Sequence, residues 1–171
     1  ISRIDWVTGS SCMGGIILTA NLTPRLTAHA PMDLAALAAQ VKAWGRDLGF
    51  QKVGIAGVEL PEDERRLLDW LAAGRHGEMR YMQRHGTRRA RPAELVPGTL
   101  RVIAARMDYW PPAEDAEAVL ADPALGYVSR YALGRDYHKV LRTRLARLAE
   151  RLAAAAGSAG YRAFTDSAPV L

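Results

Sequence analysis

Apolar residues early in the chain recur at the spacing of a helix. They stand three and four positions apart, as on one helix face: Leu34, Leu37, Val41, Trp44 and Leu48. Asp33 precedes them, where its carboxylate can cap free backbone N–H groups, and Gly49 follows them, where helices commonly end. The pattern predicts an amphipathic helix over residues 34–48.

A strand and two further helical segments are predicted next. Residues 52–60 alternate apolar and small side chains, which is typical of a short strand. Pro61 and the three acidic residues after it favour the first turn of a helix, which should end near Gly74. Residues 77–82 are expected to form a short helical turn.

The remaining sequence predicts two more strands and a long helix. Residues 101–109 are the clearest strand, and Pro111 stops it. An acidic, alanine-containing segment after it forms a loop or a small helix. Leucines at helical spacing from His138 onward mark a long helix that runs into the alanine-rich residues 153–160, and residues 161–165 form a last extended run. Because helices alternate with strands, we expect a layered α+β domain.

Residues 1–31 show neither helical nor alternating periodicity. Residues 28–30 resemble the cleavage site of a secretory signal, but Asp5 stands where such a signal carries basic residues, and its apolar segment would be too short. We therefore expect residues 1–31 to be a disordered leader or a mis-called start before Met32. Residues 32–171 are then the folded domain.

Composition limits the class of protein. The chain has 171 residues, of which 49% are hydrophobic and 24% charged, as expected for one soluble globular domain. Its apolar residues 14–20 fall short of the roughly 20 that span a bilayer. A single cysteine, Cys12, excludes an internal disulfide and any iron–sulfur cluster held by this chain alone. The net charge of +5 favours an anionic partner.

Common catalytic motifs are absent from the sequence, but three segments are unusually polar. Residues 84–97 are rich in arginine, which can hold phosphate or carboxylate groups through forked hydrogen bonds, or can simply face solvent. Residues 127–138 gather tyrosines and arginines at a helix entrance, where anions are favoured. Alternatively, Asp136 only caps that helix and His138 is a core histidine.

The third segment begins at the end of the last predicted strand. Asp166 stands there, and Pro169 restricts the backbone just beyond it. A carboxyl group in this position can be directed into a cleft, and apolar surroundings that raised its pKa would make it a proton donor. The alternative is a local turn in which Asp166 binds neighbouring backbone amides.

In this order, the three segments resemble the amino-terminal half of the epoxyqueuosine reductases, cobalamin-dependent iron–sulfur enzymes of queuosine biosynthesis in tRNA. The resemblance covers residues 32–171 and is carried by three phrases: Arg89-x-x-Pro92-x-x-Leu95-x-Pro97, Ser129-Arg-Tyr-Ala-x-Gly-x-Asp-Tyr-His138 and Asp166-Ser-Ala-Pro-Val170. It implies an α+β cobalamin-binding domain with a mixed sheet and flanking helices, similar to the nitroreductase-like folds.

The resemblance also implies an activity, the reductive deoxygenation of epoxyqueuosine to queuosine at the tRNA wobble position. Two [4Fe–4S] clusters in a ferredoxin-like region beyond residue 171 would reduce the cobalt of cobalamin, which attacks the epoxide while an acid protonates its oxygen. Asp166 matches the family's proton donor. Arg89, Ser129, Tyr137, His138 and Asp166 itself match positions expected to line the cobalamin site. Without cluster cysteines, this fragment of the oxidoreductase should be inactive alone.

Partners follow from the same resemblance. We expect tRNA carrying epoxyqueuosine, an unidentified electron donor, a cytoplasmic location, no membrane association and a monomer. The other arginines of the polar segments either contact RNA phosphates or belong to a solvated surface: Arg84, Arg88, Arg91, Arg130 and Arg135. Two alternatives stay open, a non-catalytic carrier module that binds cobalamin or flavin, and a basic RNA-binding domain.

Overall fold

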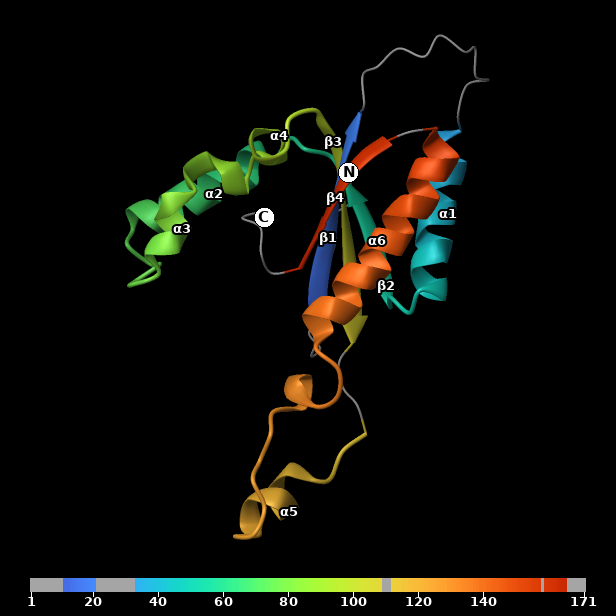
Figure 1. Ribbon diagram of the computed structural model, residues 1–171. Helices are drawn as coiled ribbons and strands as arrows, with labels where there is room; N and C mark the ends of the chain where they lie inside the picture. The colour runs from blue at the N-terminus through green and yellow to red at the C-terminus, as the bar shows by residue number, and fades with distance from the viewer. Residues whose placement is uncertain (1–10, 21–32, 109–111, 158, 166–171) are drawn as a thin grey trace.

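The computed structural model describes residues 11–20, 33–108, 112–157 and 159–165 (Figure 1). Helices and strands are both present, which confirms the α+β class. The strands are β1 (Ser11–Ala20), β2 (Lys52–Ala56), β3 (Thr99–Asp108) and β4 (Ala159–Phe164), and they form one four-stranded sheet in the order β2-β3-β1-β4. Three of these strands lie where the sequence pattern predicts them, with β2 shorter than expected.

Strand β1 falls within residues 1–31, where the sequence predicted no helix or strand. It pairs with β3 from Ser11 opposite Asp108 to Thr19 opposite Thr99, and its second half pairs with β4. Both of its edges are therefore hydrogen-bonded, so a disordered leader is wrong for residues 11–20. The other residues of that segment, 1–10 and 21–31, lie outside the described part of the chain.

The sheet is antiparallel at each described pairing, so the expected mixed sheet is wrong for this part of the chain. Strands β3 and β4 both run opposite to β1 and hence in the same direction as each other. They would form a parallel pair, and the sheet would be mixed, if they were neighbours. Because β1 lies between β3 and β4, each of them pairs with β1 in the antiparallel direction, and β2 is likewise antiparallel to β3.

Two helices cover one face of the sheet (Figure 1). The first, α1 (Leu34–Asp47), is capped by Asp33, whose carboxylate accepts hydrogen bonds from two backbone N–H groups. The second, α6 (Tyr137–Ala156), begins one residue before the predicted start and is capped by Asp136. Helix α1 contacts β2, and α6 contacts β1, β4 and α1. Both predicted helices are confirmed.

The core lies between these two helices and the sheet. Its fully buried side chains come from α1, from the turn after it, from β3 and above all from one face of α6: Val41, Phe50, Ile103, Ala105, Leu141, Leu145, Leu148, Ala149 and Leu152. The leucines repeat at three and four residues, so the helical period of the sequence accounts for this face. Leu34, in the first turn of α1, is exposed instead.

Two glycines permit the close packing of α1. A Cβ atom at Gly45 would collide with Cγ2 of Val53, so glycine lets the helix approach β2 directly. Gly49 has a φ of +82° and lies against the guanidinium of Arg144, where a side chain would meet both backbone strain and a clash.

A group of short helices lies on the other side of the sheet from α1 and α6 (Figure 1). We call this group, residues 61–95, the helical lobe: α2 (Pro61–Ala72), α3 (Arg80–Arg84), the 3-10 helix η1 (Gly86–Arg89) and α4 (Pro92–Leu95). Helix α2 agrees with its predicted limits, whereas α3 lies slightly later than the expected turn. The arginine-rich segment, residues 84–97, forms η1 and α4, and α4 contacts β3.

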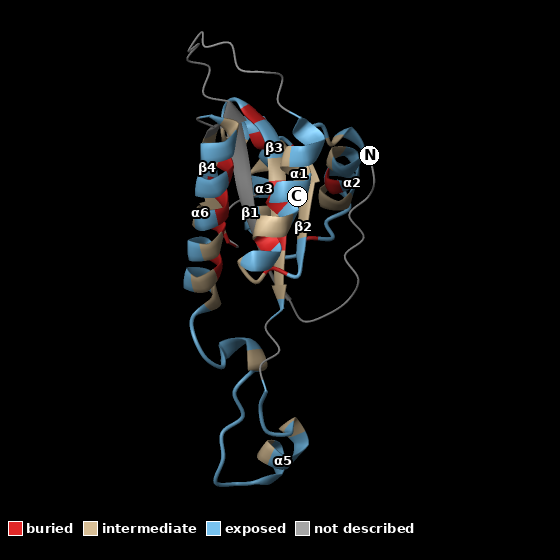
Figure 2. Ribbon diagram, turned by 90° about the vertical axis from the view of Figure 1, so that its right-hand side faces the viewer, coloured by how far each residue is buried: buried red, intermediate tan, exposed pale blue. Residues whose placement is uncertain are grey.

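The connection from β3 to α6 projects beyond the end of the sheet in both views (Figures 1 and 2). We call residues 112–136 the α5 arm, after its helix α5 (Ala116–Ala121); a 3-10 helix, η2 (Arg130–Ala132), follows in the same arm. Most of its side chains are exposed (Figure 2). Among the described residues, no helix combines the length and the apolar character needed to cross a bilayer.

Candidate functional site

The structure divides the predicted site residues between two places. Ser129 lies in the α5 arm, and Tyr137 and His138 form the start of α6. Arg89 ends η1 in the helical lobe, on the opposite side of the sheet from α6 (Figure 1). Asp166 lies outside the described residues. Three of the five residues therefore share one region, and Arg89 is separate from them.

Aromatic rings cluster where the α5 arm enters α6. The rings of Tyr137 and His138 stack with centroids 4.0 Å apart, and Tyr131 meets Tyr137 edge-on at 6.2 Å. The His138 side chain is 46% exposed, so its alternative reading as a core histidine is wrong. This arrangement forms an aromatic surface at the N-terminus of a long helix.

Asp136 fixes the geometry of this entrance. Its carboxylate accepts a hydrogen bond from the backbone N–H of His138 at 3.0 Å and lies 3.1 Å from Nδ1 of the same residue. Desolvation pushes the pKa of Asp136 upward, but the hydrogen bonds from His138 and the positive charges nearby outweigh it, so the pKa is lowered overall. The predicted capping role is confirmed, and Asp136 is ionised at neutral pH.

A cavity of about 340 Å³ adjoins the aromatic surface and is lined in part by Tyr131 and Tyr137. Its opposite wall comes from the turn after α1 and the end of β3. There the Gln51 side-chain oxygen accepts a hydrogen bond from the Asp108 backbone N–H at 2.7 Å, and Arg144 reaches the Gly49 carbonyl at 3.4 Å. The cavity thus combines aromatic walls with polar groups that the sheet holds in place.

Arg89 is anchored inside the helical lobe. One terminal nitrogen of its guanidinium donates to the Tyr81 carbonyl at 3.3 Å, and the guanidinium carbon lies 5.8 Å from the centre of the Tyr81 ring. Its Nε atom is buried and has no hydrogen-bond partner among the described residues. The Nε–H group of Arg89 is therefore a buried hydrogen-bond donor for which the described part of the chain offers no acceptor.

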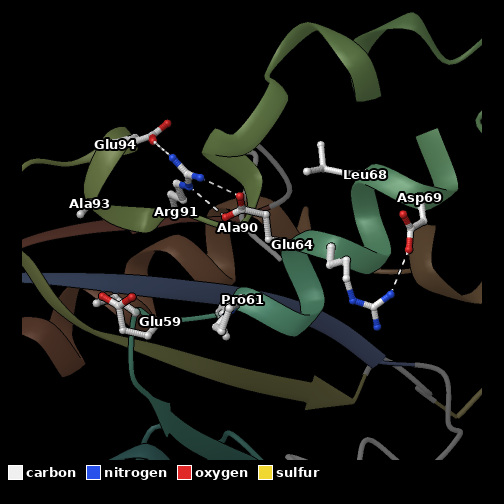
Figure 3. Close-up of a pocket in the computed structure, with 12 residues that line it drawn as sticks. Glu59, Pro61, Glu64, Leu68, Asp69, Ala90, Arg91, Ala93 and Glu94 are labelled. Atoms are coloured by element: carbon white, nitrogen blue, oxygen red, sulfur yellow. Dashed lines mark hydrogen bonds and ion pairs between the residues drawn. The ribbon is translucent and has the colours of Figure 1, made fainter. Parts of the chain in front are cut away.

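A second cavity, of about 610 Å³, lies between α2 and the segment from η1 to α4 (Figure 3). Arg91 bridges its walls. Nε and one terminal nitrogen of Arg91 donate to the two carboxylate oxygens of Glu64 at 2.8 and 2.7 Å, and the other terminal nitrogen donates to Glu94 at 3.0 Å. Such forked, charge-assisted bonds are strong and directional. Arg91 is therefore occupied by carboxylates, which argues against its predicted alternative role as an RNA contact.

Little in the sequence indicates this bridge. Glu64 and Arg91 are separated by 27 positions and lie on different elements, so no local spacing relates them. Only the pair of Arg91 and Glu94, three residues apart, has the spacing of neighbours on a helix surface. The hydrogen bond from Arg91 is the main cause that lowers the pKa of Glu64, and the same bond is the main cause that raises the pKa of Arg91.

This bridge should make the acid stability of the protein depend on Glu64. A carboxyl group whose pKa is lowered on folding stabilises the protein above its unfolded pKa, and the stabilisation is lost as pH falls through the folded pKa. We expect Glu64→Gln to lower the urea midpoint at neutral pH and to flatten its decline between about pH 5 and pH 2. Glu62→Gln, an exposed glutamate on the same helix, is the control and should leave the decline unchanged. Equal declines in the protein and in Glu64→Gln would contradict the prediction.

Comparisons with known proteins agree with the resemblance. The family model described as "Epoxyqueuosine reductase QueG, DUF1730" matches residues 89–167. Curated relatives named epoxyqueuosine reductase include one from Pseudomonas aeruginosa, 60% identical over 88% of this chain and 42% of its own length. Those from Vibrio cholerae and Escherichia coli are 56% and 55% identical over 82% of this chain, and over 38% and 37% of their own lengths. No solved structure matches the chain.

The matched region contains all five predicted site residues, from Arg89 to Asp166. The chain spans about two fifths of the length of the curated relatives that it matches. On these similarities, and on the phrases that carry them, the chain is similar to the epoxyqueuosine reductases over most of its length.

Proposed function

We propose that the protein containing this chain is an oxidoreductase that converts epoxyqueuosine to queuosine at the wobble position of tRNA. The observation that carries the proposal is the identity of 55 to 60% with curated epoxyqueuosine reductases over most of the chain. In this proposal the chain supplies the cofactor-binding part and the proton donor. It does not turn over alone, because its one cysteine cannot ligate the two [4Fe–4S] clusters that reduce the cofactor.

The cofactor of the proposal is cobalamin, which supplies the reducing chemistry at its cobalt when it is bound. Two features of the described residues fit such a large, amide-rimmed group that carries an anionic phosphate. The buried Nε of Arg89 lacks a partner among those residues, and guanidinium N–H groups suit an anion. Exposed apolar and aromatic side chains, Val128, Tyr131 and Leu133, flank the start of α6, where a ligand with apolar faces can cover them.

Each candidate residue then has a distinct role. Arg89, which lies on the other side of the sheet from α6, binds an anionic group there, so its role is proposed separately from those of the other three residues. Ser129, which is exposed in the α5 arm, and His138 bind polar groups at the edge of the ring or its nucleotide tail. Tyr137, held by its stacking on His138, offers an aromatic face. These roles rest on the matching phrases of the family and on the chemistry of the side chains.

Asp166 is the proton donor of the proposal. Its match to the family phrase is the main support, and Thr165 directly before it adds a second. Thr165 is 1% exposed, so the last described residue before Asp166 is buried. A carboxyl group that stays protonated near neutral pH needs surroundings that raise its pKa, and a low-dielectric interior does so.

Further parts of the proposal follow the resemblance alone. The complete protein has a nitroreductase-like arrangement, acts as a monomer in the cytoplasm, and takes its electrons from a separate donor. The antiparallel sheet described above supports the α+β class only.

A chimera tests the proposed function. This chain would replace the corresponding part of the Pseudomonas aeruginosa relative, which supplies the remaining length. We expect the chimera to form queuosine in tRNA that carries epoxyqueuosine, measured by mass spectrometry of the nucleosides. The unmodified relative is the positive control.

Two results would overturn the proposal in favour of its alternatives. A folded chimera that changes the absorption spectrum of cobalamin but forms no queuosine would indicate a carrier module. A chimera that leaves the spectrum unchanged, forms no queuosine and binds RNA in a salt-sensitive way would indicate a basic RNA-binding domain.

A further inference from the structure

The helical lobe carries a dense group of positive charges. Six arginines and one carboxylate, Glu78, occur between residues 75 and 91: Arg75, Arg80, Arg84, Arg88, Arg89 and Arg91. This stretch begins in the turn after α2, includes all of α3 and η1, and ends just before α4. The local excess of positive charge equals the formal net charge of the whole chain, +5, because six arginines less one glutamate leave five.

The structure separates these arginines by what they bind. Arg91 is held by two carboxylates, and Arg89 is held by Tyr81, as described above. The side chains of the other four, Arg75, Arg80, Arg84 and Arg88, are exposed and make no ion pair or hydrogen bond with any described residue. We call these four the open arginines.

Neighbouring arginines in the same lobe behave differently. On α2, Arg65 pairs with Asp69 at 3.1 Å, and Arg66 lies 3.5 Å from both Glu62 and Asp63. Helix α2 carries four carboxylates and two arginines, so its charge is net negative, whereas the surface of α3 and η1 stays positive. Among the described residues of the lobe, the unpaired positive charge thus lies on α3, on η1 and, at Arg75, in the turn after α2.

An aromatic side chain lies among the open arginines. Arg80 and Arg84 are four residues apart in α3, so they share one face of that helix. Tyr81, next to Arg80, is 57% exposed. Arginines that bind phosphates together with an exposed ring on which a base can stack are the combination by which proteins bind single-stranded and looped RNA.

We propose that the open arginines, with Tyr81 among them, bind the phosphate backbone and an unpaired base of the tRNA substrate's anticodon arm. This inference rests on the proposed function for the identity of the RNA and on charge complementarity for its location. A membrane surface fits less well, because α3 has five residues and is too short to lie in a bilayer interface as an amphipathic helix.

The test is the affinity of the purified chain for a fluorescent RNA hairpin with the sequence of the anticodon arm, measured by anisotropy over a range of salt concentrations. Replacing the four open arginines together by alanine should weaken binding by roughly a hundredfold at low salt and lower the slope of log Kd against log salt by about 3. Tyr81→Ala should weaken binding by about tenfold without changing that slope, because stacking releases no counterions.

The matched control is Arg65→Ala with Arg66→Ala, which removes two arginines of the same lobe that are already paired. Affinity and slope should stay as in the unchanged chain. All variants change exposed side chains, and circular dichroism checks that they fold. An unchanged affinity in the fourfold variant, or an equal loss in the control, would overturn the inference. A fourfold variant that lost binding to vesicles of anionic lipid but still bound RNA would also overturn the inference.

The chimera separates this inference from the proposed function. If the chimera forms queuosine while the fourfold variant binds RNA normally, the location of the RNA surface is wrong and the reductase stands. If the fourfold variant loses RNA affinity while the chimera forms no queuosine, the RNA surface stands and the reductase is wrong.

Discussion

Asp166→Asn should strongly lower the rate of queuosine formation by the chimera while leaving cobalamin binding unchanged. An amide fills the space of the carboxyl group but has no acidic proton to give to the epoxide oxygen. Loss of a positioned general acid typically costs about 10²- to 10⁴-fold in rate, and we expect kcat to fall within that range. Nucleoside mass spectrometry measures the turnover, and the absorption spectrum measures the bound cobalamin.

Asp122→Asn is the control for this prediction. Asp122 lies in the exposed α5 arm, and its carboxylate only accepts a hydrogen bond from the Ala124 backbone N–H, which an asparagine oxygen can also accept. We expect normal turnover from this variant.

If Asp166 is a general acid, kcat of the unchanged chimera should also fall as the pH rises above the pKa of that carboxyl group. Normal turnover by Asp166→Asn would mean that a group other than Asp166 donates the proton to the epoxide oxygen.

Leu145→Ala should remove a large part of the stability of the fold. Leu145 is fully buried on the face of α6 that packs against the sheet and α1. Truncating such a leucine loses its burial and leaves a cavity, which together cost about 2 to 5 kcal/mol of the free energy of unfolding. Urea denaturation followed by circular dichroism gives this value.

Two further variants serve as controls for the stability prediction, one at an exposed leucine and one that keeps the volume of the Leu145 side chain. Leu120→Ala truncates the same side chain where it is 67% exposed in α5, and should change stability by less than about 0.5 kcal/mol. Leu145→Met keeps the volume and should cost less than about 1.5 kcal/mol, so it remains measurable if the alanine variant does not fold. Similar losses from Leu145→Ala and Leu120→Ala would mean that α6 does not pack on the sheet as described.

The candidate site shows where sequence reasoning succeeds and where it stops. The phrases around Arg89, Ser129 and Asp166 predicted the family to which the comparisons find the chain similar, because a motif records which residue types recur in order. The same phrases gave no distances. Arg89 proved to lie across the sheet from Tyr137, and Arg91 proved to be bound by Glu64, a residue that no motif contained.

The sequence by itself determined the elements whose signals are local. Periodic leucines and an aspartate cap specified α1 and α6, and a proline with acidic residues specified the start of α2, because each signal acts within a few turns of one helix. Only the tertiary structure decided that residues 11–20 form an inner strand and that β3 and β4 are thereby kept apart. Strand pairing and salt bridges between elements join residues far apart in the chain, and their energy exists only after the chain has brought those partners together.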